Sequence, residues 1–179
     1  MSIHVALLRG INVGGHNRVA ASDLRDLLGA LGFAGAKSLL QSGNLVFESD
    51  GRTGAKLECL LEVETARRLD VTADYLVRAA DEWQAMVAGN PFPEEAERNP
   101  GHLVVMFLKT APQGEDVQAL QAAIEGPESI RAEGRHLYVT YPAGIGRSKL
   151  TGALIEKKLD ARGTARNWNT VVKLLTLCR

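Results

Sequence analysis

Two stretches of the chain follow the same pattern, and this repetition limits the folds that the sequence can adopt. Residues 39–47 ("LLQSGNLVF") and 130–139 ("IRAEGRHLYV") are each a pair of short apolar runs around a turn that contains glycine. Such a pattern is typical of a β-hairpin. Each hairpin is followed by glycine, arginine and a hydroxyl residue before a helical pattern, "GRT" at 51–53 and "GRS" at 146–148. The sequence therefore predicts an internal duplication.

The elements around the first hairpin complete a βαββαβ order. Residues 3–9 are apolar and strand-like, and the leucines of 22–31 recur on one face of a helix. A second helical pattern follows residues 51–53, and apolar residues alternate along 71–79, as they do in a half-buried strand. This order of elements is that of a ferredoxin-like unit.

The second half repeats this pattern after a linker. Residues 89–101 contain three prolines and mixed charge, and they separate a first subdomain, 1–88, from a second, 102–179. In the last segment Trp168 and Val171 recur at helical spacing where a closing strand is due. The predicted fold class is α+β with two related ferredoxin-like (βαββαβ) subdomains, the second ending in a helix instead of a closing strand.

The composition excludes partners that bind through overall charge. Lysine plus arginine and aspartate plus glutamate both number 21, so no net field attracts nucleic acid or an anionic membrane. No apolar run approaches the roughly 20 residues of a membrane span, and the N-terminus lacks the pattern of a signal peptide. Cys59 and Cys178 are far apart in sequence and are expected to be buried free thiols. These features predict a cytoplasmic protein that does not bind a membrane.

Polar residues from two loops of the first subdomain are predicted to meet. In a ferredoxin-like sheet the first and third strands are antiparallel neighbours, so the loop after residues 3–9 lies beside the turn of the first hairpin. Arginine offers a planar fork for phosphate, the amides add donors, and paired glycines let backbone N–H groups approach a ligand. The residues predicted to form this polar rim are Arg9, Asn12, Gly14, Gly15, Gln41, Ser42 and Asn44.

The glycine spacing of this loop matches neither the dinucleotide-binding motif nor the P-loop motif. An alternative is that the glycines shape a turn and the asparagines form hydrogen bonds with their own backbone.

Two further polar stretches are candidates for anion binding. "GIGRSKL" (144–150) precedes a helix, so Arg147, Ser148 and Lys149 are placed to hold an anion beside free N–H groups. "TARNWNT" (164–170) begins the last helix and adds Arg166, Asn167 and Asn169. The alternatives are that Ser148 is a helix cap and that the tryptophan between the asparagines belongs to the core.

Conventional catalytic and metal sites are not evident. The four histidines show no pairing at the spacing of metal ligands. Ser148 and Lys149 are sequence neighbours, which turns their side chains apart on a helix and argues against a serine–lysine dyad. The sequence predicts no metal and no cofactor, and it leaves open whether the protein is an enzyme and what its oligomeric state is.

Four motifs in order, "LRGINVGG", "QSGN", "GIGRSKL" and "TARNWNT", resemble those of the bacterial domain of unknown function 1697 family. The resemblance covers nearly the whole chain. It implies a cytosolic α+β protein with two related ferredoxin-like subdomains, and it implies no activity. Besides the polar residues named above other than Arg147, the positions that match the family's motifs are Gly43, Gly144, Gly146, Leu150, Thr164, Trp168 and Thr170.

These observations support two hypotheses. The first is a protein that binds a phosphorylated ligand, a nucleotide or a nucleic-acid end, in a polar cleft between its halves. The alternative is a non-enzymatic interaction module in which the polar motifs are structural glue between the halves. Binding of RNA across an open sheet face is disfavoured because few aromatic residues fall on suitable strands.

Overall fold

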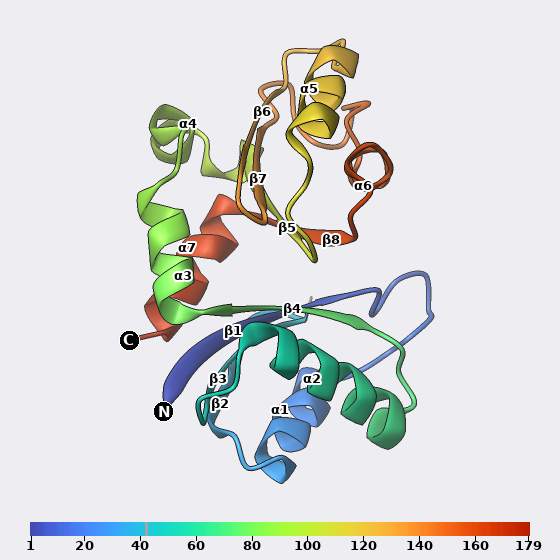
Figure 1. Ribbon diagram of the computed structural model, residues 1–179, viewed down its shortest axis with the longest axis vertical. Coiled ribbons are helices and arrows are strands. Elements are labelled where there is room, and N and C mark those ends of the chain that lie inside the picture. Colours follow the sequence, from blue (N-terminus) through green and yellow to red (C-terminus); the bar gives the residue numbers. More distant parts are fainter. Residues whose placement is uncertain (42) are drawn as a thin grey trace. The chain divides into compact units, whose positions relative to one another are not determined.

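Two four-stranded antiparallel sheets organise the chain (Figure 1). The computed structural model describes residues 1–41 and 43–179. The prediction that Ser42 belongs to the polar rim therefore lies outside the described residues. The chain forms two units, residues 1–85 with 173–179, and residues 86–172.

The first sheet has the strand order β2-β3-β1-β4, with every neighbouring pair antiparallel. The elements up to the end of α3 are β1 (Ser2–Arg9), α1 (Ala21–Ala30), β2 (Ala34–Ser38), β3 (Asn44–Ser49), α2 (Gly54–Leu69), β4 (Asp74–Ala79) and α3 (Ala80–Ala88). The predicted βαββαβ order and the pairing of the first strand with the third are confirmed.

The second sheet has the equivalent order, β6-β7-β5-β8. The remaining elements are α4 (Pro93–Arg98), the 3-10 helix η1 (Pro100–His102), β5 (Leu103–Leu108), α5 (Gly114–Ala123), β6 (Ser129–Glu133), β7 (His136–Thr140), α6 (Gly152–Leu159), β8 (Gly163–Asn167) and α7 (Trp168–Leu177). The α+β fold with two related halves is confirmed. The segment predicted as a linker, 89–101, contains the short helix α4 and most of η1.

The end of the second half differs from the prediction in one respect. It does contain a closing strand, β8, which pairs antiparallel with β5, and helix α7 follows that strand. The prediction of a helix instead of a strand was wrong because β8 carries few apolar residues. Its place in the sheet depends on backbone hydrogen bonds to one neighbour, which leave little trace in the side-chain pattern.

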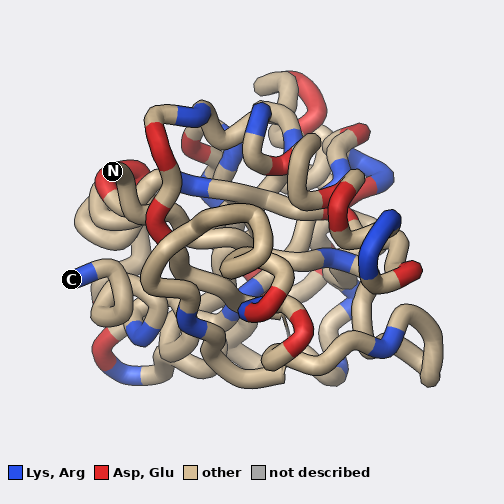
Figure 2. The backbone as a smooth tube through the Cα atoms, turned by 90° about the horizontal axis from the view of Figure 1, so that it is seen from below, with Lys and Arg blue, Asp and Glu red and all other residues tan. Residues whose placement is uncertain are grey.

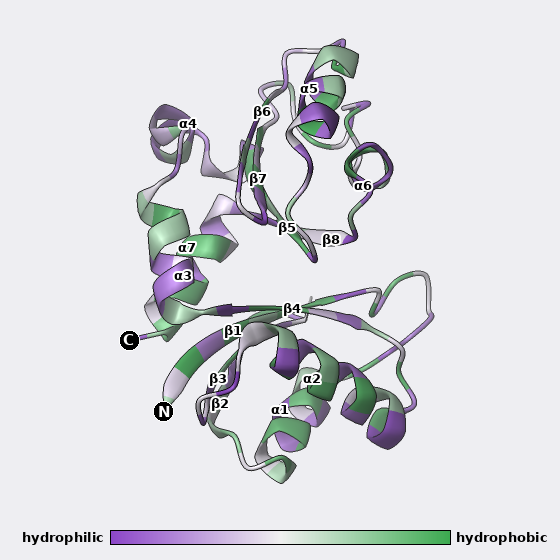
Figure 3. Cartoon of the chain, in the orientation of Figure 1, coloured by the Kyte–Doolittle hydropathy of each residue, from purple (hydrophilic) through white to green (hydrophobic). Residues whose placement is uncertain are grey.

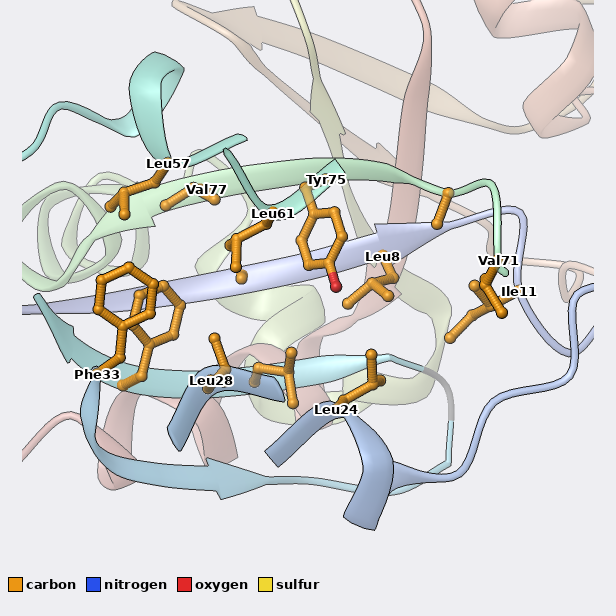
Figure 4. Close-up of a cluster of buried hydrophobic side chains, with 14 residues drawn as sticks. Leu8, Ile11, Leu24, Leu28, Phe33, Leu57, Leu61, Val71, Tyr75 and Val77 are labelled. Atoms are coloured by element: carbon orange, nitrogen blue, oxygen red, sulfur yellow. The ribbon is translucent and has the colours of Figure 1, made fainter. Parts of the chain in front are cut away.

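The core of the first unit lies between its sheet and helices α1 and α2. Figure 4 shows Leu24 and Leu28 of α1 and Leu57 and Leu61 of α2 gathered with Tyr75 of β4 in one buried cluster. In Figure 3 both helices carry hydrophobic and hydrophilic residues, as expected for helices with one face on a sheet. Burial of each leucine contributes about 1.5–3 kcal/mol, so the apolar contact between the sheet and these two helices dominates the stability of the unit.

One edge of each sheet is protected by glutamates. Strand β4 is an edge strand, and the N–H groups of Tyr75 and Val77 donate to Glu62 at 3.0 Å and Glu58 at 2.9 Å, both on α2. Strand β8 is the equivalent edge of the second sheet, and Gly163 N–H donates to Glu156 of α6 at 3.0 Å. Such contacts use the N–H groups that would otherwise pair with another chain.

Helices α2 and α6 are equivalent in detail. Glu58 and Glu156 are each the fifth residue of their helix. Each helix begins with glycine after a threonine N-cap, and the two threonines are Thr53 and Thr151. Each ends at an aspartate with left-handed backbone. The equivalent of Thr53 is therefore Thr151 and not Ser148, so the match between "GRT" and "GRS" is offset by three residues.

The cysteines are free, as predicted, but their predicted burial was wrong. Cys59 is exposed on α2 and Cys178 is half-buried. Leu57 and Leu61 occupy the inward face of α2, and Cys59, midway between them, lies on the opposite face. Among the described residues, no helix is long and apolar enough to cross a membrane.

Candidate functional site

The loop after β1 and the turn between β2 and β3 meet, as the topology predicts. Leu8 N–H donates to Gly43 O at 2.9 Å, and Asn12 Nδ2 donates to Gln41 O at 3.0 Å. Residues about thirty positions apart therefore line one end of the first sheet. Gly14 and Gly15 lie in the same loop with positive φ angles of 57° and 80° and are exposed.

Three polar side chains of this rim, those of Arg9, Asn12 and Asn44, are bonded within the first unit. Arg9 Nη1 lies 3.0 Å from Asp74 Oδ2 in an ion pair. The Asn12 side chain both accepts from Val19 N–H at 3.0 Å and donates to Val19 O at 3.3 Å. Asn44, only 1% exposed, donates to Leu39 O at 2.9 Å. These contacts favour a structural role for the rim.

Asn17, which was not among the predicted site residues, belongs to the same network. Its Nδ2 donates to Gly10 O and to Thr72 O, both at 3.0 Å, and its φ of 49° is left-handed. Asparagine tolerates this conformation better than most residues. A second asparagine five positions after Asn12 in a glycine-rich loop was the available signal.

Asn44→Ala is expected to lower the free energy of unfolding by about 1–3 kcal/mol, because it removes the hydrogen bond that the buried Asn44 side chain donates to the carbonyl of Leu39. Urea melts of the full chain measure this loss. Gln41→Ala is the matched control, since its exposed side chain has no hydrogen bond with a described residue. Equal stability of both variants and the wild type would contradict a structural role for Asn44.

A pocket of about 510 Å³ lies in the second unit, and the predicted residues Arg147, Ser148 and Lys149 line it. They belong to the loop between β7 and α6, and the α6 N-terminus, capped by Thr151, begins after them. The alternative that Ser148 caps this helix is therefore wrong. The apolar residues that line the pocket include Leu120, Ile124, Leu150 and Leu154.

Two glutamates that the sequence analysis did not single out complete the polar part of this pocket. Ser148 Oγ donates to Glu128 Oε1 and accepts from Leu150 N–H at 3.0 Å. Lys149 Nζ lies 3.3 Å from Glu125 Oε2, and both side chains are well exposed, at 88% and 77%. Exposed pairs of this kind are weak, so either charge is available to a ligand.

Arg147 is exposed and forms no hydrogen bond or ion pair with the residues that the structure describes. The end of the same loop is held in place, since Tyr141 OH donates to Leu150 O at 2.9 Å. Burial raises the pKa of Tyr141 to about 12. The pocket thus combines a guanidinium that is unpaired among the described residues, a lysine, two carboxylates and apolar side chains.

The candidate residues of the 164–170 segment do not line this pocket. Arg166 donates to Thr164 Oγ1 at 2.6 Å and to Ala165 O at 2.9 Å, and burial lowers its pKa to about 10. Asn167 Oδ1 accepts from Thr170 N–H at 3.0 Å at the start of α7, and Asn169 is exposed. None of them lines the pocket that contains Arg147.

Charges of both signs are interspersed along the chain, with no extended region of one sign (Figure 2). Among the described residues, no group of three histidine, cysteine or acidic side chains is arranged to hold a metal ion.

Comparison with known proteins gives a family and a fold. The family model described as "Protein of unknown function (DUF1697)" matches residues 1–138. The conserved bacterial protein SP0830 from Streptococcus pneumoniae has a similar structure, with a TM-score of 0.75 at 22% identity over 99% of both chains.

Two hydrolases are also similar in sequence. The 6-aminohexanoate-cyclic-dimer hydrolase of Pseudomonas sp. (strain NK87) is 30% identical over 175 residues, which cover 93% of this chain and 34% of that enzyme. The enzyme of the same name from Paenarthrobacter ureafaciens is 29% identical over 143 residues, covering 76% of this chain and 28% of the relative. The chain thus spans about a third of the length of these curated relatives.

Proposed function

We propose that this chain, which belongs to the DUF1697 family of proteins of unknown function, binds a phosphorylated small molecule in the pocket of its second half. The observation that carries the proposal is Arg147, whose guanidinium has no partner among the described residues and which lines the pocket. Guanidinium groups suit phosphate because their donors match two of its oxygens.

The pocket favours a nucleotide or a nucleic-acid end among phosphorylated ligands. Arg147 and Lys149 supply charge for a phosphate, and the leucines offer an apolar surface for the flat face of a base. Glu125 and Glu128 are acceptors for sugar hydroxyls or a base amine. A volume of about 510 Å³ lies within the range of small-molecule sites.

The proposal assigns the ligand to the loop of Arg147, Ser148 and Lys149. The internal bonds of Asn12 and Asn44 support a structural role for the polar rim within the first half, whereas glue between the halves stays a prediction. A wider cleft that also includes the rim and the 164–170 segment stays a prediction.

A thermal-shift screen of the full chain against nucleotides, sugar phosphates and 5′-phosphorylated oligonucleotides tests the proposal. A ligand at 100 times its Kd is expected to add about 2.7 kcal/mol to the free energy of unfolding. Arg147→Ala is expected to weaken binding at least about tenfold, since hydrogen bonds to charged groups contribute about 1.5–3 kcal/mol. Arg131→Ala, on exposed strand β6 outside the pocket, is the matched control. No saturable shift with any phosphorylated compound would refute the proposal.

The similarity to two 6-aminohexanoate-cyclic-dimer hydrolases supports a second candidate, in which the same pocket accepts an amide of 6-aminohexanoate. Its apolar floor suits the methylene chain, and Ser148 bonded to Glu128 is a hydroxyl–carboxylate pair beside it. Incubation with the cyclic dimer and measurement of newly released amino groups tests this candidate. Release that is unchanged in Ser148→Ala would contradict it.

A further inference from the structure

A second cavity, of about 380 Å³, lies in the first unit where β1 and α2 begin and β4 ends. His4, Arg52, Gly54 and Asp81 are among the residues that line it. It shares no residue with the pocket around Arg147.

His4 is a buried histidine, and only one of its two ring nitrogens has a hydrogen-bond partner among the described residues. The residue is 3% exposed, and its ring stacks on Phe47 with centroids 6.0 Å apart. Nδ1 lies 3.1 Å from Ser2 O and 3.2 Å from Ser49 Oγ. A carbonyl oxygen only accepts, so Nδ1 carries the proton and Nε2 carries a lone pair.

Nε2 has no hydrogen-bond partner among the described residues and is not fully enclosed. Burial, opposed by the Ser2 carbonyl and the carboxylates of Glu82 and Asp81, lowers the pKa of His4, so the ring is neutral at pH 7. A neutral imidazole held in this orientation at a cavity can accept a hydrogen bond from a hydroxyl or N–H group of a ligand.

The N-terminus of α2 supplies donors to the same cavity. Thr53 Oγ1 accepts from Lys56 N–H, whereas two N–H groups have no partner in the described part of the chain. One belongs to Gly54, which lines the cavity, and the other to Ala55, the next residue of the helix. Arg52 is exposed, its guanidinium carbon lies 5.6 Å from the centroid of the Phe33 ring, and it pairs with no described carboxylate. Free N–H groups, the helix dipole of a 16-residue helix and a cation together favour an anion.

Asp81 adds an acceptor to the cavity. One of its oxygens accepts from Glu82 N–H at 2.8 Å, and its carboxylate is exposed. The cavity therefore has donors for an anion and, in His4 and Asp81, acceptors for neutral donors. A bare anion leaves the acceptors unused and is repelled by Asp81, so the chemistry selects a ligand with both an anionic group and hydroxyls.

We infer that this cavity binds a small hydroxylated phosphate monoester, with its phosphate at the Gly54 and Ala55 N–H groups and Arg52, and one hydroxyl donating to His4 Nε2. The site stands independently of the pocket around Arg147, because it uses other residues in the other unit.

Three small probes separate the parts of this inference: glycerol 3-phosphate, n-propyl phosphate without the hydroxyls, and glycerol without the phosphate. NMR of the full chain follows the His4 Nε2 resonance and the Gly54 and Ala55 amide signals. Glycerol 3-phosphate is expected to move all three saturably and to bind about fivefold more tightly than n-propyl phosphate, as one added hydrogen bond allows. Glycerol alone is expected to move none of them.

Variants assign the two contacts. Arg52→Ala is expected to lower the affinity for both esters. Arg67→Ala, at the other end of α2, is expected to leave both affinities unchanged. His4→Asn keeps a donor for Ser2 O but lacks Nε2, so it is expected to remove only the preference for glycerol 3-phosphate. Arg147→Ala is expected to leave these signals unchanged.

A His4 Nε2 resonance that does not respond to glycerol 3-phosphate in the wild type overturns the inference, even if His4→Asn does not fold. Equal affinity of the wild type for the two esters also overturns it. So does an affinity for glycerol 3-phosphate that is the same in Arg52→Ala as in the wild type.

Discussion

Replacing Gly43 with alanine is expected to lower the free energy of unfolding by about 2–5 kcal/mol. Gly43 has a φ of 76°, a left-handed conformation that costs other residues about 1–2 kcal/mol. An added Cβ would lie 2.8 Å from Leu8 Cβ and 2.9 Å from Ile11 Cδ1, and relieving such overpacking costs about 1–3 kcal/mol more. Gly43 O also accepts from Leu8 N–H, so the turn cannot move away without breaking that bond.

Gly32→Ala is the matched control for this prediction. Its φ of 83° is similar, but nothing lies within 4 Å of an added Cβ. Only the conformational cost of about 1–2 kcal/mol is expected there. Urea melts of both variants measure the difference, and equal losses would show that the contact with β1 and its following loop is not the cause.

Replacing Glu58 with alanine is expected to destabilise the protein by about 3–5 kcal/mol, the range for removing one partner of a buried ion pair. Glu58 is 6% exposed, and its Oε1 lies 3.8 Å from Nη1 of Arg78, which is 1% exposed. The same oxygen accepts from Val77 N–H at 2.9 Å on the edge strand. Its loss removes a charge opposite a buried guanidinium and leaves a buried N–H group without a partner.

Glu58→Gln separates these two effects. Glutamine retains an oxygen that can accept from Val77 N–H and loses only the charge that faces Arg78. Its loss of stability is therefore expected to be smaller than that of Glu58→Ala. Thermal and urea melts of the two variants test this order, and a larger loss in Glu58→Gln would contradict the role of the backbone contact.

Much of the fold could be predicted because it depends on patterns within the sequence. The hairpins and the leucine-rich helix faces follow from apolar periodicity, and the pairing of β1 with β3 then brings Asn12 to Gln41. Strand β8 was missed because its residues carry little apolar signal. The prediction that Cys59 is buried was wrong because a leucine-rich helix still has an outer face, where Cys59 lies.

The candidate site was harder to predict, because a side chain's partners are set by tertiary structure. "QSGN" and "GIGRSKL" are similarly polar, yet Asn44 is bonded in the interior while Arg147 is exposed beside a pocket. Glu128 became a site residue only because β6 begins beside the loop of Ser148. Glu58 and Glu156 look like ordinary helix charges until the edge strands that they protect are known.

The central claim is that the pocket around Arg147 binds a phosphorylated ligand, and an NMR titration of the full chain with AMP tests it most directly. Saturable changes are expected at the backbone N–H groups of residues 144–150 and of Glu125, Gly126 and Glu128, which line or adjoin the pocket. These changes are expected to weaken in Arg147→Ala and to persist in Arg131→Ala. No saturable change at these amides, or an identical response in Arg147→Ala, would contradict the claim.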